Sequence, residues 1–208
     1  MLRVGVRFAP ATGRAGDYLA DVIALEAAGA DSVWLDATAA STEPWILLGA
    51  MAAVTHRIRL GVMVGAEAGW QGAVDTLARF TSGRVIVGTP PHREMNAFIE
   101  ELKSSGRSSV LVICEGRDDA EEAPPLADGV ILAATPDEVL ALRSREGDFE
   151  IWVDVSAPAD KVGWVQMVSA MESSGATGIV VPWDPRLIDL LRSAGEPDDR
   201  TDLLIATG

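Results

Sequence analysis

Short runs of β-branched and other apolar residues alternate with longer segments of helical periodicity along the whole chain. This alternation is typical of a parallel sheet whose strands are connected by helices. The pattern predicts strands at 2–8, 32–36, 58–64, 84–89, 109–114, 129–133, 149–155 and 178–182. It predicts helices at 16–29, 43–55, 70–81, 92–105, 136–146, 160–175 and 185–194. The acidic, proline-containing segment 115–128 is expected to hold a single helical turn at most.

Eight β/α repeats without a composition break predict one domain, and they favour a closed (β/α)8 TIM barrel over an open doubly wound sheet. The 208 residues are enough to bury one sizeable core, so the barrel should be compact. We expect the domain to span 1–195, with 196–208 as a C-terminal tail. The first strand should pair with the last.

Charged residues interrupt the apolar pattern on one face of several predicted strands. Arg3 and Arg7 alternate with apolar residues in the first strand, and Arg59 does so in the third. Because the helix-facing side of a barrel strand must be apolar, these arginines should point into the lumen. Carboxylates occupy the corresponding faces of other strands, at Asp36, Glu150 and Asp154. A ring of arginine–carboxylate pairs is therefore expected, with a catalytic constellation of the same residues as the alternative.

The chain is strongly acidic, with a formal net charge of -14 and a pI near 4.4. Nucleic acid and anionic membrane surfaces are not expected as partners, because binding them needs clustered lysine and arginine. Cys114 is the single cysteine and lies in an apolar run, which indicates a buried residue and a reducing, cytoplasmic compartment. No apolar stretch approaches the roughly 20 residues of a membrane span. The two histidines lack a second ligand at suitable spacing, so no metal site is predicted.

Three stretches, "ALEAAGADSVWLDA", "PWILLGAMAAVTHRIRLGVMV" and "AVDTLARFTSGRVIVG", resemble the N-terminal half of the luciferase-like monooxygenase family. Further on, "SVLVICEGRDDAEEAPPLADGVILAATPDEV" and "ESSGATGIVV" resemble its later strands. The order of "THRIRLG" and "TSGRVIVG", about 20 residues apart, is more restrictive than either piece alone. The chain is thus similar to a short, divergent member of the bacterial luciferase and deazaflavin-dependent oxidoreductase type. Part of this motif also has a physical explanation, since His56 and Arg57 fall where a helix ends and can meet its last carbonyls.

The resemblance implies a monooxygenase-type oxidoreductase that binds reduced flavin mononucleotide or the deazaflavin coenzyme F-420 at the C-terminal mouth of the barrel and acts on a small molecule. The residues at the matching positions that would contact the cofactor are Trp34, Met63, Val64, Gly65, Thr89, Glu115, Gly116 and Arg117. Asp36 and Asp154 would be the catalytic groups. Trp34 and Trp152 face inward, where they either stack on the flavin ring or fill a narrow lumen.

The chain departs from the family pattern at three places. Relatives that use the deazaflavin often carry a histidine near the end of the second strand, where this chain leaves Asp36 as the titratable group. The glycine turn that holds the cofactor phosphate in relatives reads "CEGRDD" here, so carboxylates flank Gly116 and only Arg117 compensates them. A single helix replaces the longer insertion before the fifth strand, which should leave the mouth more open.

Three functions follow from these residues. The first is a flavin- or deazaflavin-dependent oxidoreductase, in which the cofactor supplies the chemistry. The second is a non-catalytic barrel that has lost the phosphate site, has no cofactor, and acts by ligand binding or association. The third is a mouth that attracts a cation or an amine to Asp36, Glu115, Asp154 and Asp184. We also expect a homodimer through the helices at 43–55 and 70–81, because "PWILLGAMAAV" is more apolar than one packing face requires.

Overall fold

The computed structural model describes residues 1–9, 14–38, 43–65, 70–104, 108–142 and 149–194. Strands and helices alternate throughout these ranges. The strands are β1 (Arg3–Arg7), β2 (Ser32–Ala37), β3 (Arg59–Val64), β4 (Val85–Thr89), β5 (Ser108–Cys114), β6 (Gly129–Leu132), β7 (Glu150–Asp154) and β8 (Gly178–Pro182). The helices are α1 (Ala15–Ala28), α2 (Glu43–Val54), α3 (Gln71–Phe80), α4 (Met95–Ser104), α5 (Arg117–Glu121), α6 (Pro136–Leu142), α7 (Lys161–Ser174) and α8 (Arg186–Ala194).

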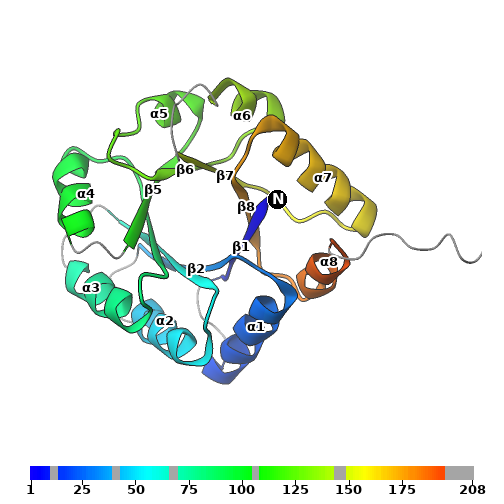
Figure 1. Cartoon of the computed structure of the whole chain (residues 1–208), viewed down its shortest axis with the longest axis horizontal. Coiled ribbons are helices and arrows are strands. Elements are labelled where there is room, and N and C mark those ends of the chain that lie inside the picture. The colour runs from blue at the N-terminus through cyan, green and yellow to red at the C-terminus, as the bar shows by residue number, and fades with distance from the viewer. Residues whose placement is uncertain (10–13, 39–42, 66–69, 105–107, 143–148, 195–208) are drawn as a thin grey trace, which may run out of the picture.

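The strands form one closed parallel barrel in sequence order, with β1 paired to β8. Figure 1 shows the helices as an outer ring around this barrel. The predicted (β/α)8 fold and the pairing of the first strand with the last are confirmed. Every strand begins and ends within one residue of its predicted bounds, because period-two alternation bounded by glycine or charge is a strong signal in a barrel.

The helices also follow the prediction. The weak segment 115–128 holds only α5, a helix of five residues. Within the described ranges, every helix is too short or too polar to span a bilayer. The predicted helix end at 143–146 and the predicted tail at 196–208 lie outside the described residues.

The barrel separates two apolar cores. Outward side chains of the strands, such as Val4, Val62 and Val153, pack against the helices, and Cys114 is buried among them as predicted. Inward side chains form a second cluster within the lumen. Its members are Trp34, Met63, Ile86, Leu111, Ile131, Trp152 and Val180.

Two tryptophan rings fill the middle of the lumen, and glycines make room for them. Trp34 and Trp152 are both 0% exposed. A Cβ atom on Gly5 or Gly61 would lie less than 3.0 Å from the Trp34 ring, and one on Gly178 would lie 2.5 Å from the Trp152 ring. A larger residue at any of these positions would displace a ring. The lumen is therefore a packed core, and filling it is the role that the structure gives these tryptophans.

The turn between α2 and β3 is held by a carboxylate at the N-terminal end of the barrel. One oxygen of Glu26, on α1, accepts the backbone N–H groups of residues 56, 57 and 58 at 2.6–2.9 Å. Burial raises the pKa of Glu26, but the three N–H donors outweigh it and hold this pKa below its ordinary value of 4.5. Glu26 therefore anchors the entry of the chain into β3.

The carbonyl groups of the same turn are held from the other side by Arg84, just before β4. Its guanidinium donates to the carbonyl oxygens of Thr55 and Ile58 at 3.0 and 2.7 Å. The side chains of His56 and Arg57, which the sequence suggested as cations at the end of α2, are exposed, and the cation that binds the carbonyls of this turn is Arg84. Glu26 and Arg84 together form what we name the turn clamp.

Helix α2 is apolar on its outer face as well as its inner face. Its only charged residue is Glu43. Ile46 is 71% exposed, and Gly49 and Ala53 are exposed along the same side. A surface helix normally carries charged residues on this face, so an apolar one indicates a surface that another molecule covers.

We propose that a second copy of the chain covers this face, with α3 and its 79% exposed Phe80 at the edge of the interface. Sedimentation equilibrium at tens of micromolar should give the dimer mass, and Ile46→Glu should give the monomer mass. Val162→Glu is the control, because Val162 is 66% exposed on α7 and should leave the dimer intact. A monomeric unmodified protein would refute the proposal.

Candidate functional site

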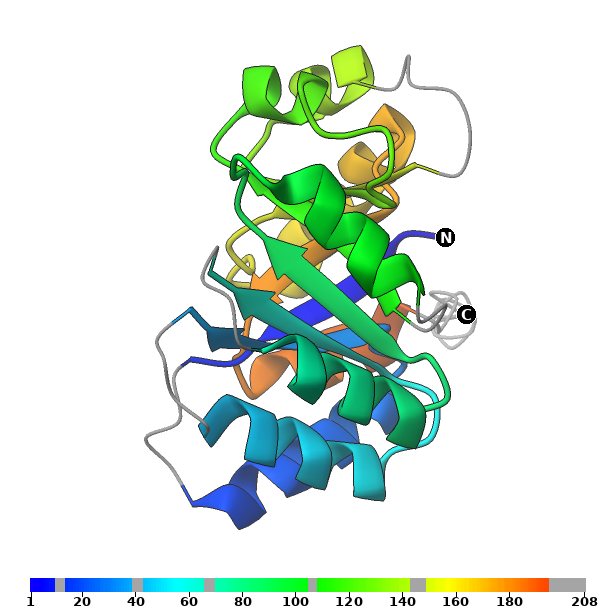
Figure 2. The same cartoon turned by 90° about the vertical axis from the view of Figure 1, so that its left-hand side faces the viewer.

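The C-terminal ends of the parallel strands lie together at one end of the barrel (Figure 2), where (β/α)8 enzymes carry their reacting groups. We call this end the mouth. Arg7 ends β1 and Asp154 ends β7. The two guanidinium nitrogens Nη1 and Nη2 of Arg7 donate to the two oxygens of Asp154 at 2.6 and 3.2 Å. This is one of the predicted inward pairs, and its side chains are 33% and 29% exposed, so a ligand at the mouth can reach them.

Asp36 lies at the end of β2 but is not part of the ring of pairs. Its Oδ1 accepts hydrogen bonds from the backbone N–H and the hydroxyl of Thr38 at 2.8 and 2.6 Å. Among the described residues it pairs with no arginine, so its predicted place in the ring is wrong. An aspartate can bind its own backbone two residues on, and here that local bond uses the oxygen that an arginine would need. The Asp36 side chain is exposed at the end of β2.

The floor of the mouth is apolar. Met63 near the end of β3 is 8% exposed, and Ile113 near the end of β5 is half-buried against the lumen cluster. A ligand at the mouth would meet these two side chains rather than Trp34, which is completely buried beneath them. An apolar floor with a few polar groups is typical of sites for small, flat molecules.

The turn after β5 lies at the rim of the mouth, and two of its donors are already bound. The backbone N–H of Glu115 donates to Asp119 Oδ2 at 3.1 Å. The Arg117 Nε donates to Glu121 Oε1 at 2.5 Å, and this partner raises the pKa of Arg117. The side chains of Glu115 and Asp118 are exposed and negative. These residues do not fit a phosphate group, since the cation is neutralised and two carboxylates remain.

The other predicted cofactor residues are placed at different depths. Val64 and Thr89 are 0% exposed, and Val64 packs in the core between barrel and helices. Gly65 follows β3 and is half-buried. The structure thus brings Met63, Gly65 and the turn at 115–117 to the mouth, and it buries Val64, Thr89 and Trp34 in the wall and lumen.

The carboxylates proposed to attract a cation are partly neutralised. Asp154 is bound by Arg7, and Arg186 binds both oxygens of Asp184 at 2.9 and 2.8 Å. The hydrogen bonds from Arg186 lower the pKa of Asp184 to about 2. Within the described ranges, no cluster of metal-ligating side chains occurs. Of the four carboxylates, Asp36 and Glu115 have no arginine partner among the residues that the structure describes.

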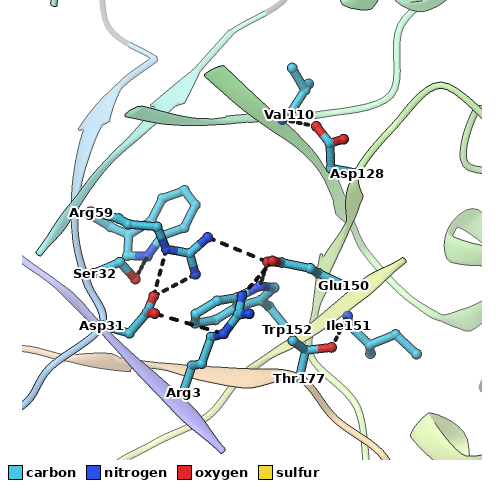
Figure 3. Close-up of polar contacts among 11 residues, drawn as sticks. Arg3, Asp31, Ser32, Arg59, Val110, Asp128, Glu150, Ile151, Trp152 and Thr177 are labelled. Carbon is cyan, nitrogen blue, oxygen red and sulfur yellow. Dashed lines mark hydrogen bonds and ion pairs between the residues drawn. The ribbon is translucent and has the colours of Figure 1, made fainter. Parts of the chain in front are cut away.

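A second charged group closes the opposite, N-terminal end of the lumen (Figure 3). Arg3 Nη1 donates to Glu150 Oε1 at 2.5 Å, and Arg59 donates to Asp31 Oδ2 at 2.6 and 3.0 Å. The indole N–H of Trp152 also donates to Glu150, at 2.7 Å, and the Arg59 guanidinium lies 5.3 Å from the centre of its ring. The predicted ring of pairs is therefore confirmed for Arg3, Arg59 and Glu150. Asp31 was not predicted, because it precedes the predicted strand.

No family model matches the sequence, and no curated protein matches it in sequence. Solved structures match it in fold. The coenzyme F-420-dependent tetrahydromethanopterin reductase from Methanopyrus kandleri has a TM-score of 0.70 at 10% identity, over 94% of this chain and 97% of that one. An F-420-dependent secondary alcohol dehydrogenase, solved with an F-420–acetone adduct, has a TM-score of 0.66 at 12% identity, over 92% and 97%. QR15, an aldolase, has a TM-score of 0.60 at 13% identity, over 87% and 89%. At these identities the likeness establishes the (β/α)8 barrel, which oxidoreductases and an aldolase share.

Proposed function

We propose that this chain is a luciferase-like oxidoreductase that binds a reduced flavin or the deazaflavin coenzyme F-420 at the mouth. The observation that carries the proposal is the Arg7–Asp154 pair, whose side chains are 33% and 29% exposed, beside the apolar floor of Met63 and Ile113. A fold shared with two F-420-dependent enzymes over more than nine-tenths of the chain supports it. The substrate is a small molecule that reaches the same floor.

The mouth fits one part of such a cofactor better than the other. Its apolar floor suits a flat ring system, and the partly exposed guanidinium of Arg7 offers a donor to a ring carbonyl or to the substrate. The turn at 115–119 does not suit the phosphate, because its own carboxylates bind two of the nearby donors and two further carboxylates, of Glu115 and Asp118, are exposed there. We therefore expect the ring to supply most of the affinity. When bound, the cofactor supplies the hydride or oxygen chemistry.

Titration of the purified protein with flavin mononucleotide and coenzyme F-420, each oxidised and reduced, tests the proposal. Binding should quench tryptophan fluorescence, and Met63→Glu should abolish it by placing a charge on the floor. Glu100→Gln on α4 is the control, because Glu100 is exposed on the outer ring of helices and should leave binding unchanged. Binding that survives Met63→Glu would show that the ring lies elsewhere.

Removing charge from the rim should strengthen binding of a phosphate-bearing cofactor. Replacing Glu115 by Gly and Asp118 by Ser is expected to lower the Kd for flavin mononucleotide by roughly tenfold, because two carboxylates near the dianion are lost. The Kd for riboflavin, which lacks the phosphate, should not change. Submicromolar binding by the unmodified protein, with no effect of the double substitution, would show that the turn is not beside the phosphate.

A second function is favoured by the same turn. If neither cofactor binds in either redox state, the chain is a non-catalytic barrel that acts by ligand binding or association. The supporting observation is that Asp119 and Glu121 occupy two donors of the turn, while the exposed carboxylates of Glu115 and Asp118 disfavour a phosphate there.

A further inference from the structure

A cavity of about 580 Å³ opens at the N-terminal end of the barrel, on the side opposite the mouth. The charged group drawn in Figure 3 forms part of its wall. Charged side chains dominate its wall, which contains Arg3, Arg57, Arg59, Glu26, Asp31 and Glu150. Equal numbers of arginines and carboxylates suggest a neutral cavity, so the hydrogen bonds of each group decide what the cavity can bind.

The carboxylates of this wall are already occupied. Glu26 accepts three backbone N–H groups in the turn clamp. Asp31 accepts two hydrogen bonds from Arg59. Glu150 accepts one from Arg3 and one from Trp152. Little acceptor capacity therefore remains for a cationic ligand.

The arginines, by contrast, keep unused donors. The backbone N–H of Arg57 donates to Glu26, but its guanidinium forms no hydrogen bond or ion pair with any part of the protein that the structure describes. The Arg59 Nη1 is 3.7 Å from its nearest carboxylate oxygen, on Glu150, which is too far for a hydrogen bond, although this side chain is only 21% exposed. The Arg3 Nε is likewise 4.0 Å from Asp31. A half-buried guanidinium with free N–H groups gains from an oxyanion.

We propose that this cavity binds a small oxyanion with a single negative charge, such as a monocarboxylate, between Arg57 and Arg59. The three carboxylates of the wall disfavour a dianion, because each additional negative charge meets them at short range. The site is independent of the cofactor, since the packed rings of Trp34 and Trp152 separate it from the mouth.

Nuclear magnetic resonance of the 15N-labelled protein tests this site directly. The arginine Nε–H resonances are followed during titration with sodium acetate, and separately with sodium sulfate, at constant ionic strength set with chloride. Acetate should shift the Arg57 and Arg59 resonances along saturable curves, and sulfate should bind more weakly. Arg57→Gln should weaken acetate binding by at least about fivefold, since it removes the free guanidinium.

Arg79→Gln provides the matched control. Arg79 is also an exposed arginine, but it lies at the end of α3 and donates to the Asp75 carbonyl, away from the cavity. It should leave acetate binding unchanged. Shifts that never saturate, that persist in Arg57→Gln, or that are stronger with sulfate would overturn the proposal. Flavin titrations should give the same Kd with and without acetate. The absence of acetate binding in the cavity and the absence of flavin binding at the mouth can therefore be distinguished.

Discussion

Replacing Trp34 by alanine is expected to lower the free energy of unfolding by about 3–5 kcal/mol. The ring is completely buried. The surrounding strands cannot close in on the space it leaves, because the hydrogen bonds of the closed barrel fix their backbones. Gly5 and Gly61, which lie against the ring, have no side chains that could fill the space it leaves. A cavity should therefore remain. Urea unfolding followed by circular dichroism measures the loss.

Two observations separate a cavity from a general loss of packing. Indole should stabilise Trp34→Ala, and not the unmodified protein, because an apolar cavity in a rigid lumen binds a ring of the size removed. Trp183→Ala is the control, since Trp183 is only half-buried after β8 and its removal should cost much less. A loss below about 1 kcal/mol for Trp34→Ala would mean that the lumen collapses around the missing ring.

Glu26→Gln should destabilise the protein by about 1–2 kcal/mol near neutral pH, because a neutral amide accepts the three N–H groups more weakly than a carboxylate. The effect should depend on pH. The folded-state pKa of Glu26 lies below its ordinary value of 4.5, so its contribution is complete above that pH. It is lost as the pH falls through the lowered pKa. The difference in unfolding free energy between the two proteins should therefore shrink below pH 4.5.

Urea unfolding at a series of pH values checks this result. Asp189→Asn serves as the control, because Asp189 is exposed on α8 and holds no backbone turn. Its difference from the unmodified protein should stay small at every pH. A difference for Glu26→Gln that is independent of pH would show that the amide disturbs packing rather than the charged hydrogen bonds.

The strands and the inward direction of their charges could be predicted from the sequence because both depend on short-range alternation. Arg3, Arg7 and Arg59 break an apolar pattern, and the barrel offers only the lumen to such side chains. The partners were less predictable. Asp31 pairs with Arg59 from a loop position that has no alternation, and Asp36 instead binds its own turn.

The residues of the turn clamp lie within the motifs that resemble the luciferase-like family. Glu26 belongs to the stretch "ALEAAGAD", and Arg84 belongs to "TSGRVIVG". Both hold the "THR" turn at the end of the barrel opposite the mouth. The most restrictive motifs therefore encode how the chain enters β3, which is a structural requirement, and they carry no information about the cofactor.

The chemistry of the mouth could not be predicted to the same degree. Whether Arg117 was available to a phosphate depended on Glu121, one helical turn away, and whether Trp34 faced a ligand depended on side chains stacked above it from other strands. The Arg117–Glu121 pair needs the five-residue helix α5, for which the sequence pattern is weak, and the side chains above Trp34 come from other strands, for which a single sequence has no periodic signal.

The pairs Arg3–Glu150 and Arg7–Asp154 each join residues that are 147 positions apart. Strand β8 lies between β1 and β7, so both pairs reach across it. They therefore stabilise the place where the first and last strands meet, which we call the seam. Closing a loop of this length carries a large entropic cost, and the contacts that repay it form only when both ends are present. We therefore expect closure of the seam to limit the rate of folding, and a nascent chain presents β1 and β7 as open edges until β8 has been synthesised.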